Sequence, residues 1–162
     1  MTRQFFAAAI ILALTGGVGY RFWPEREPLC PVCGRPIHHA TSYYVTLDNG
    51  KRVELCCTRC GLRFQENGGD VRTARVTDFD TGRLLDPEAA VYVEGSSVHP
   101  CCTNKELLKD QAGSEYERTW DRCLPSVIAF SSKQAAQKFQ SEHGGELRTH
   151  EEIVSETRIG AY

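Results

Sequence analysis

Cysteine is the residue type most able to carry out chemistry in this sequence, because the 162-residue chain contains eight cysteines. Four of them form two Cys-x2-Cys pairs, Cys30 with Cys33 and Cys57 with Cys60, and 23 residues separate the pairs. A Cys-x2-Cys turn lets two thiolates approach one ion on a tight bend, and two such turns complete a tetrahedral four-sulfur site. The spacing therefore predicts a structural site for Zn(II) or Cu(I).

Disulfide bonds are the main alternative interpretation of these pairs, since an even number of cysteines in an oxidising compartment is typical of a disulfide framework. A thioredoxin-like redox pair is less consistent with the sequence, because no βαβ pattern flanks Cys30 and Cys33.

The other half of the cysteines comprises Cys56, the adjacent Cys101 and Cys102, and Cys123, with His99 two residues before Cys101. Adjacent cysteines pair with each other only through a strained peptide, whereas soft thiolates readily hold an ion of low coordination number such as Cu(I). We therefore expect a second, transferable soft-ion site near His99, Cys101, Cys102 and Cys123. For Cys56, a buried and inert thiol is the plainer interpretation.

Other function classes lack their sequence signatures. The chain has no Ser-His-Asp arrangement that the sequence can identify, no Gly-x-Gly-x-x-Gly motif and no P-loop. Its net charge is −2, and no stripe of Lys and Arg provides the positive surface that binding to phosphates requires. The sequence therefore predicts a protein that is neither an enzyme nor a nucleic-acid-binding protein.

The N-terminus predicts export. Residues 5–20 are uncharged and mostly apolar, Arg3 precedes them, and Phe22 and Trp23 follow as aromatic interfacial residues. Residues 1–23 are thus predicted to be a signal peptide or a transmembrane anchor, and residues 24–29 a charged linker. We expect the domain on the extracytoplasmic, periplasmic side of the cell membrane, or secreted if the segment is cleaved.

The elements that would position the cysteines follow a repeated order. Strand-like residues 43–47 and 51–55 are joined through an Asn-Gly turn, and a helix over 58–66 leads into a strand over 71–77. Strand-like residues 90–93 and 127–130, a helix to about residue 143 and a Gly-Gly pair repeat this order. The sequence therefore predicts an α+β fold of two similar ββαβ halves, residues 30–80 and 81–152, after an N-terminal hydrophobic anchor helix. The second half carries an inserted cysteine-containing loop, and residues 153–162 form a tail.

This order of motifs resembles the NosL family, the exported, membrane-attached and copper-binding accessory proteins of nitrous oxide reductase. The resemblance spans residues 30–152 and depends on several short motifs: Cys33-Gly34, Asp48-Asn49-Gly50, Cys57-x2-Cys60 with Phe64, Asp78-Phe79-Asp80-Thr81, residues 90–96, residues 128–131, and Phe139 with Gly144-Gly145. It implies two ββαβ halves and a copper-binding role. The NosL fold also resembles that of organomercurial lyase.

The chain departs from the NosL pattern where methionine is common in the family. Arg35 follows Cys33-Gly34 in place of methionine, Cys101 follows Pro100 in place of methionine, and no lipid-attachment cysteine is present. At Cys101 a thiol thus replaces a thioether, which is compatible with a soft ion. The departures from the family pattern put delivery to nitrous oxide reductase in doubt.

The sequence as a whole predicts a membrane-tethered metal-binding protein that carries Zn(II) or Cu(I) and has a recipient metalloprotein as a possible partner. Two alternatives from other classes are open at this point. One is a disulfide-stapled interaction module without metal, and the other is a thiol enzyme that acts on mercurials or disulfides.

Overall fold

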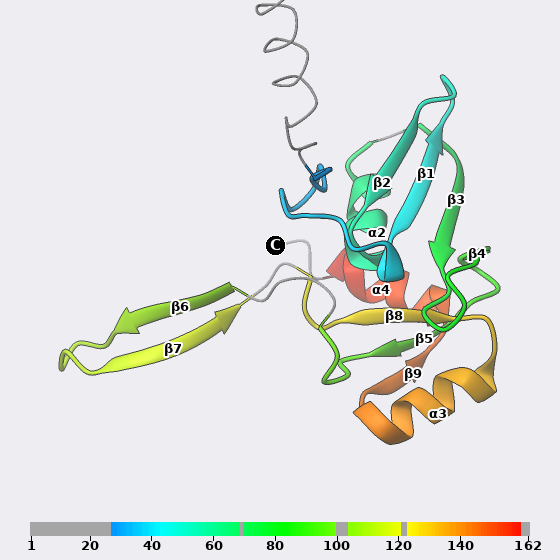
Figure 1. Ribbon diagram of the computed structural model, residues 1–162. Helices are drawn as coiled ribbons and strands as arrows, with labels where there is room; N and C mark the ends of the chain where they lie inside the picture. Colours follow the sequence, from blue (N-terminus) through cyan, green and yellow to red (C-terminus); the bar gives the residue numbers. More distant parts are fainter. Residues whose placement is uncertain (1–26, 69, 100–103, 121–122, 160–162) are drawn as a thin grey trace, which may run out of the picture.

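The computed structural model describes residues 27–68, 70–99, 104–120 and 123–159, which form an α+β fold (Figure 1). The predicted anchor, residues 1–23, lies outside this part of the chain. Among the described residues, no helix has the length and apolar character needed to cross a membrane.

The first half is a four-stranded antiparallel sheet with one helix. Its elements are, after a 3-10 turn η1 (His39–Thr41), β1 (Tyr43–Leu47), β2 (Arg52–Leu55), α2 (Thr58–Glu66), β3 (Val71–Thr77) and β4 (Leu84–Leu85). The strand order is β2-β1-β3-β4. Gly50, at a φ of 81°, supplies the positive dihedral that the turn between β1 and β2 needs. The bounds of α2 and β3 agree with the sequence prediction.

The second half repeats this arrangement. Its elements are β5 (Val91–Glu94), β8 (Val127–Phe130), α3 (Lys133–His143) and β9 (Glu146–Arg148), with the strand order β8-β5-β9. In both halves the first strand is central, and the strands before and after the helix flank it. The α+β fold of two ββαβ halves is therefore confirmed.

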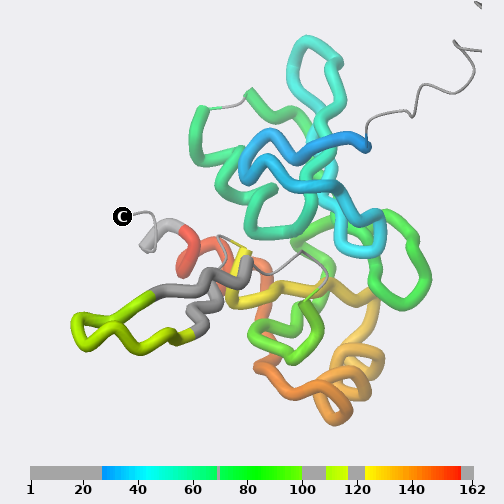
Figure 2. Tube along the Cα trace, turned by 60° about the vertical axis from the view of Figure 1, so that its left-hand side comes forward, coloured from blue at the N-terminus to red at the C-terminus, as the bar shows by residue number. Residues whose placement is uncertain are grey.

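Two features go beyond the predicted elements. The insertion in the second half contains a hairpin of β6 (Asn104–Lys109) and β7 (Glu115–Trp120), which extends away from the two sheets (Figures 1 and 2). Residues 153–159, which we expected to be part of a tail, belong to α4 (His150–Ile159). A reciprocal capping interaction starts this helix, because Thr149 Nα donates to Glu152 Oε2 at 2.7 Å and Glu152 Nα donates to Thr149 Oγ1 at 3.3 Å.

One apolar core joins the two halves. It contains Tyr43 and Leu55 from the first half, Tyr92 from the second half and Ile153 from α4, all of them almost fully buried. A Cβ atom at Gly61 would overlap the ring of Tyr43, so the glycine allows α2 to lie directly on β1. The cysteines at the start of α2 are therefore placed at the centre of this shared core.

A second link between the halves lies at the end of β3. The backbone N–H of Phe79 donates to the carbonyl of Ala129 at 3.0 Å, and the buried Asp78 carboxylate accepts a hydrogen bond from the Ser131 N–H at 3.3 Å. The Thr81 hydroxyl donates to the same carboxylate at 2.6 Å. These bonds fix the turn after β3 against β8, so the two sheets form a single packed body.

Candidate metal centre

Cysteines from four separate segments meet in the core between the halves. Cys30 and Cys33 come from the loop before η1, Cys56 and Cys57 follow β2, Cys60 lies in the first turn of α2, and Cys123 precedes β8. We call these residues the six-thiol cluster. No disulfide joins any cysteine that the structure describes, and every member except the partly exposed Cys33 is buried.

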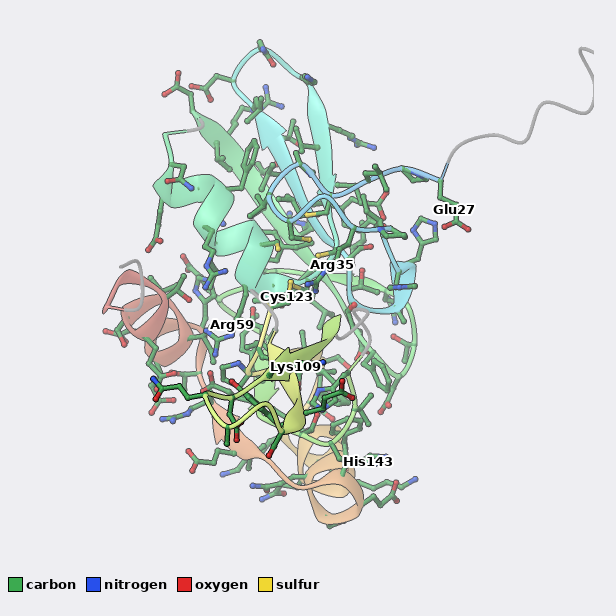
Figure 3. All side chains as sticks on the ribbon, turned by 90° about the vertical axis from the view of Figure 1, so that its left-hand side faces the viewer. Glu27, Arg35, Arg59, Lys109, Cys123 and His143 are labelled. Carbon is green, nitrogen blue, oxygen red and sulfur yellow. The ribbon has the colours of Figure 1, made fainter. Side chains whose placement is uncertain are left out.

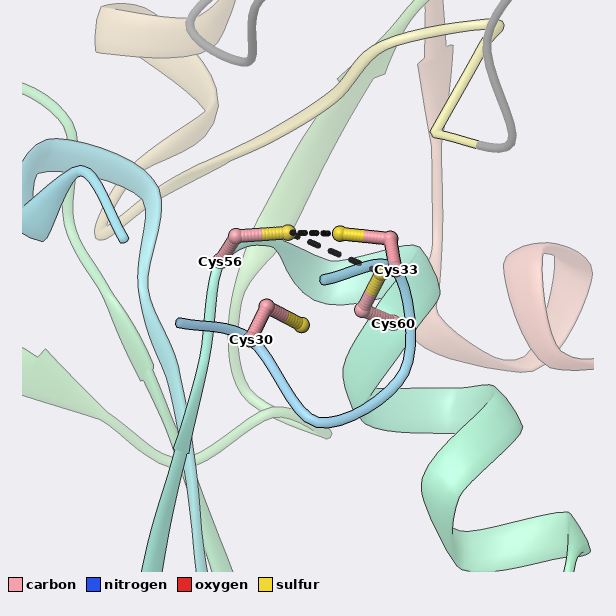
Figure 4. A group of neighbouring side chains, drawn as sticks. All are labelled: Cys30, Cys33, Cys56 and Cys60. Carbon is pink, nitrogen blue, oxygen red and sulfur yellow. Dashed lines mark hydrogen bonds between the residues drawn. The ribbon is translucent and has the colours of Figure 1, made fainter. Parts of the chain in front are cut away.

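The sulfur atoms form two overlapping groups. In the first group, the Sγ atoms of Cys30, Cys33, Cys56 and Cys60 all lie within 4.8 Å of one another (Figure 4). In the second, the same holds for Cys56, Cys57, Cys60 and Cys123. Cys56 and Cys60 thus belong to both groups.

Individual sulfur–sulfur distances are short around Cys56. Its Sγ lies 3.4 Å from that of Cys33, 3.6 Å from Cys60, 3.8 Å from Cys57 and 4.0 Å from Cys123. A metal–sulfur bond of about 2.3 Å places the sulfurs of a tetrahedral site about 3.8 Å apart and those of a trigonal site about 4.0 Å apart. The observed distances therefore match the ligand spacing of a metal–thiolate site without a change of fold.

The loop of Cys30 and Cys33 has the tight turn that the Cys-x2-Cys spacing predicted. The Gly34 N–H donates to the Cys30 carbonyl at 2.7 Å, and the Cys30 N–H donates to the Arg35 carbonyl at 2.7 Å. Gly34 has a φ of 73°, a conformation that favours glycine. The turn folds back on itself and presents both thiols to the core.

The start of α2 supplies the opposite side of the cluster. Cys57 is the N-cap residue, and its carbonyl accepts a hydrogen bond from the Gly61 N–H at 3.0 Å. The partial positive charge at a helix N-terminus favours a thiolate over a thiol in the first turn. The helix N-terminus therefore favours anionic metal ligands at Cys57 and Cys60, whereas hydrogen bonds with neighbouring thiols act in the opposite direction at Cys60.

A buried arginine positions the segment that carries Cys123. Arg59, from the first turn of α2, donates from Nε to the Pro125 carbonyl at 2.6 Å, and its guanidinium also pairs with Glu94 on β5. Both side chains of this ion pair are only 8% exposed. Figure 3 shows Arg59 and Cys123 between the two halves. Arg59 thus attaches α2 to the strand and the loop of the second half.

The thiols of the cluster perturb one another's ionisation. Hydrogen bonds from the thiols of Cys56 and Cys60 hold the pKa of Cys30 far below its ordinary value. Hydrogen bonds with Cys123 and Cys30 raise the pKa of Cys60, and burial raises the pKa of Cys33. The opposite shifts at Cys30 and Cys60 have one cause, because these thiols lie close enough to exchange hydrogen bonds with their neighbours.

The structure groups the predicted ligands differently from the sequence. Cys30, Cys33 and Cys60 share their group with Cys56, while Cys57 lies with Cys123 in the second group. Cys123 was predicted to belong to a separate site in the insertion. His99 is exposed and is in neither group, and Cys101 and Cys102 lie outside the described residues.

Cys56 is the member of the cluster that sequence reasoning assigned to an inert role. Cys56 lies outside both Cys-x2-Cys pairs, so the spacing gave no reason to count it as a ligand. The Cys-x2-Cys spacing favoured Cys57. The structure places the thiol of Cys56 3.4 Å from that of Cys33, and no pattern in the sequence indicated this contact.

The fold and the thiol cluster together define a candidate soft-metal-binding protein. No protein-family model matches the chain. Its fold is similar to that of the copper chaperone NosL from Shewanella denitrificans, with a TM-score of 0.55, 19% identity, and coverage of 79% of this chain and 90% of that one. The resemblance to NosL is thereby confirmed at the level of the fold, whereas the resemblance to organomercurial lyase stays a prediction.

A curated relative comes from a different class of protein. The chain is 22% identical over 134 residues to the HTH-type transcriptional repressor CutR of Bacillus subtilis (strain 168), a match that covers 82% of this chain. The chain spans 60% of the length of that repressor.

Proposed function

We propose that the protein is a membrane-tethered, extracytoplasmic carrier of Cu(I) and that the six-thiol cluster holds the ion. The observation that supports this most directly is the composition of the two groups, which consist of cysteine alone. Soft thiolate ligands select ions such as Cu(I) and Zn(II) over Mg(II) and Ca(II), which prefer oxygen. The fold shared with a copper chaperone favours Cu(I) of these two.

Cys33 is the thiol through which we expect the ion to be exchanged. It is the partly exposed member of the cluster, and its Sγ lies 3.4 Å from that of the buried Cys56. A thiolate of a recipient metalloprotein could replace Cys33 first and then take the ion as the deeper ligands release it.

Competition for Cu(I) tests the proposal. The reduced full chain is titrated anaerobically against a Cu(I)-selective chelator, and Cys60→Ser is compared with the matched double variant Cys101→Ser/Cys102→Ser. We expect Cys60→Ser to weaken Cu(I) binding at least about tenfold, equivalent to about 1.4 kcal/mol. Wild-type affinity in Cys60→Ser would contradict the proposal, and loss of binding only in the double variant would place the site in the insertion instead.

Three further measurements distinguish the other candidates. Zn(II) that Cu(I) cannot displace would favour a structural zinc site. An intact mass that shows disulfides in protein isolated without reductant, together with no bound metal, would favour the disulfide-stapled module. Turnover of an organomercurial would favour the enzyme.

Location is a separate part of the proposal. Residues 5–20 support a retained anchor because of their apolar composition, and Phe22 and Trp23 suit the membrane interface. Membrane fractionation with alkaline extraction, together with a periplasmic reporter fused after the last residue, tests both claims. We expect the chain to stay with the membrane and the reporter to be active.

A further inference from the structure

Two members of the six-thiol cluster lie close to all of the others. The Sγ atoms of Cys56 and Cys60 lie within 4.8 Å of the sulfurs of all the other members, and 3.6 Å from each other. The remaining thiols form two pairs, Cys30 with Cys33 and Cys57 with Cys123. Each pair completes a group of four only together with Cys56 and Cys60.

A single ion cannot bind all six thiols of the cluster. Thiolate sites for Zn(II) have four ligands, and Cu(I) accepts low coordination numbers, so one ion would leave at least two of the six thiols without a metal. Those two would be thiols beside an occupied site, either Cys30 with the partly exposed Cys33 or the buried pair of Cys57 and Cys123.

We propose that the six-thiol cluster is a two-ion site in which the thiolates of Cys56 and Cys60 bridge two soft cations. One ion lies with Cys30 and Cys33, and the other lies with Cys57 and Cys123. This inference rests on the proposed function, because it assigns the number and arrangement of the Cu(I) ions that the cluster carries.

The sulfur positions favour two groups with a shared edge over a closed octahedral cage. In an octahedron of six sulfurs, each sulfur has one distant counterpart across the centre. Cys56 and Cys60 have no such counterpart, because all the other members lie near both of them. Two tetrahedra that share the edge between Cys56 and Cys60 reproduce this pattern, with 3.6 Å as the length of the common edge.

Sharing two thiolates also limits the buried charge. Two independent four-sulfur sites would need eight thiolates, whereas two sites with a common edge need six. Since burying uncompensated charge is expensive, fewer thiolates for the same number of cations is the less costly arrangement. Each thiol that becomes a ligand releases one proton, a bridging sulfur donates a second electron pair to the second cation, and no atom changes its oxidation state.

The position of Cys123 makes the second ion depend on both halves of the fold. Cys57 lies at the start of α2, whereas Cys123 is brought to it from the second half, and Arg59 holds the nearby Pro125 carbonyl at 2.6 Å. The sulfur of Cys123 is 3.6 Å from that of Cys60. Binding of the second ion therefore joins α2 to the segment before β8.

Native mass spectrometry of the Cu(I)-loaded full chain in detergent tests this inference. The background is Cys101→Ser/Cys102→Ser, so that ions on those two residues are not counted. We expect two Cu(I) per chain, and copper K-edge X-ray absorption should show sulfur ligands together with a copper–copper scattering path. Cys123→Ser should retain one Cu(I) and lose the copper–copper path, whereas Cys56→Ser should weaken the binding of both ions at least about tenfold.

Saturation at one Cu(I) per chain would overturn the two-ion site and leave the proposed function standing. Two bound ions without a copper–copper path would also overturn it, because bridged ions must be neighbours. Both results come from the background protein itself, so they do not depend on the folding of the Cys56 or Cys123 variant. No Cu(I) bound at all would overturn the proposed function as well.

Discussion

Removing the side chain of Arg59 should destabilise the protein and open the cluster at Cys123. In Arg59→Ala the Glu94 carboxylate, 8% exposed, loses a partner within the core, and the Pro125 carbonyl loses a charge-assisted hydrogen bond. Breaking a buried ion pair by removing one partner costs about 3–5 kcal/mol. Arg148 Nε stays 3.2 Å from the other oxygen of Glu94, so we expect the lower end, about 3 kcal/mol.

Urea unfolding of the reduced, metal-free protein measures this cost. With a slope of about 2 kcal/mol per molar urea, a loss of about 3 kcal/mol lowers the midpoint by about 1.5 M. Arg75→Ala is the matched control, because Arg75 pairs with Asp86 at 3.5 Å where the side chains are 48% and 58% exposed. An exposed pair contributes about 0–1 kcal/mol, so this control should shift the midpoint by at most about 0.5 M.

The comparison between the two arginines decides whether the reasoning holds. Equal midpoints for Arg59→Ala and Arg75→Ala would show that burial of the Arg59–Glu94 pair contributes nothing measurable. The Arg59 variant should also bind Cu(I) more weakly than the Arg75 variant, since Arg59 positions the segment of Cys123. Unchanged Cu(I) affinity in a folded Arg59→Ala protein would contradict that positioning role.

Three further predictions concern the packing and the acid stability of the two halves. Gly61→Ala forces a methyl group against the Tyr43 ring and should lower the free energy of unfolding by about 1–3 kcal/mol in the same urea assay, whereas a wild-type midpoint would show that the ring can move aside. Phe139→Ala should lower the free energy of unfolding by about 3–5 kcal/mol. The ring of Phe139 is 6% exposed, and its centroid lies 5.4 Å from that of Phe79 and 5.0 Å from that of Phe130. Burial acts to raise the pKa of Asp78, but hydrogen bonds from Thr81 and from the Ser131 N–H outweigh it and lower the pKa below its ordinary 3.8. The stabilisation by this carboxylate is therefore present above about pH 4 and is lost as the pH falls through its folded pKa. Asp78→Asn should therefore reduce the acid dependence of the unfolding midpoint. Identical pH profiles for the variant and the wild type would refute this role.

Local patterns in the sequence were sufficient to predict the helix and the main strands of the first half. Alternating apolar residues, the Asn-Gly turn and the Gly-rich ends of the helices each act over a few residues, and their bounds agree with β1, α2 and β3. The repeat in the second half extended the same argument. The hairpin of β6 and β7 was not predicted, because residues 104–109 and 115–120 are rich in charged side chains and lack a clear apolar alternation.

The candidate site was only partly predictable for a different reason. Spacing identifies thiols that a single turn brings together, which is how Cys30 and Cys33 were found. It does not reveal that Cys123 lies 3.6 Å from Cys60, because that contact joins residues 63 positions apart and depends on how the halves pack. The same holds for Arg59, whose sequence neighbours give no sign of a partner on β5.

Copper K-edge X-ray absorption on the reduced full chain, loaded with one equivalent of Cu(I), tests the central claim most directly. If the six-thiol cluster holds the ion, the first coordination shell contains sulfur alone, and it loses this signature when Cys56 and Cys60 are both replaced by serine. A shell that contains nitrogen or oxygen, or a sulfur shell that persists unchanged in the Cys56→Ser/Cys60→Ser variant, would contradict the assignment of copper to this cluster.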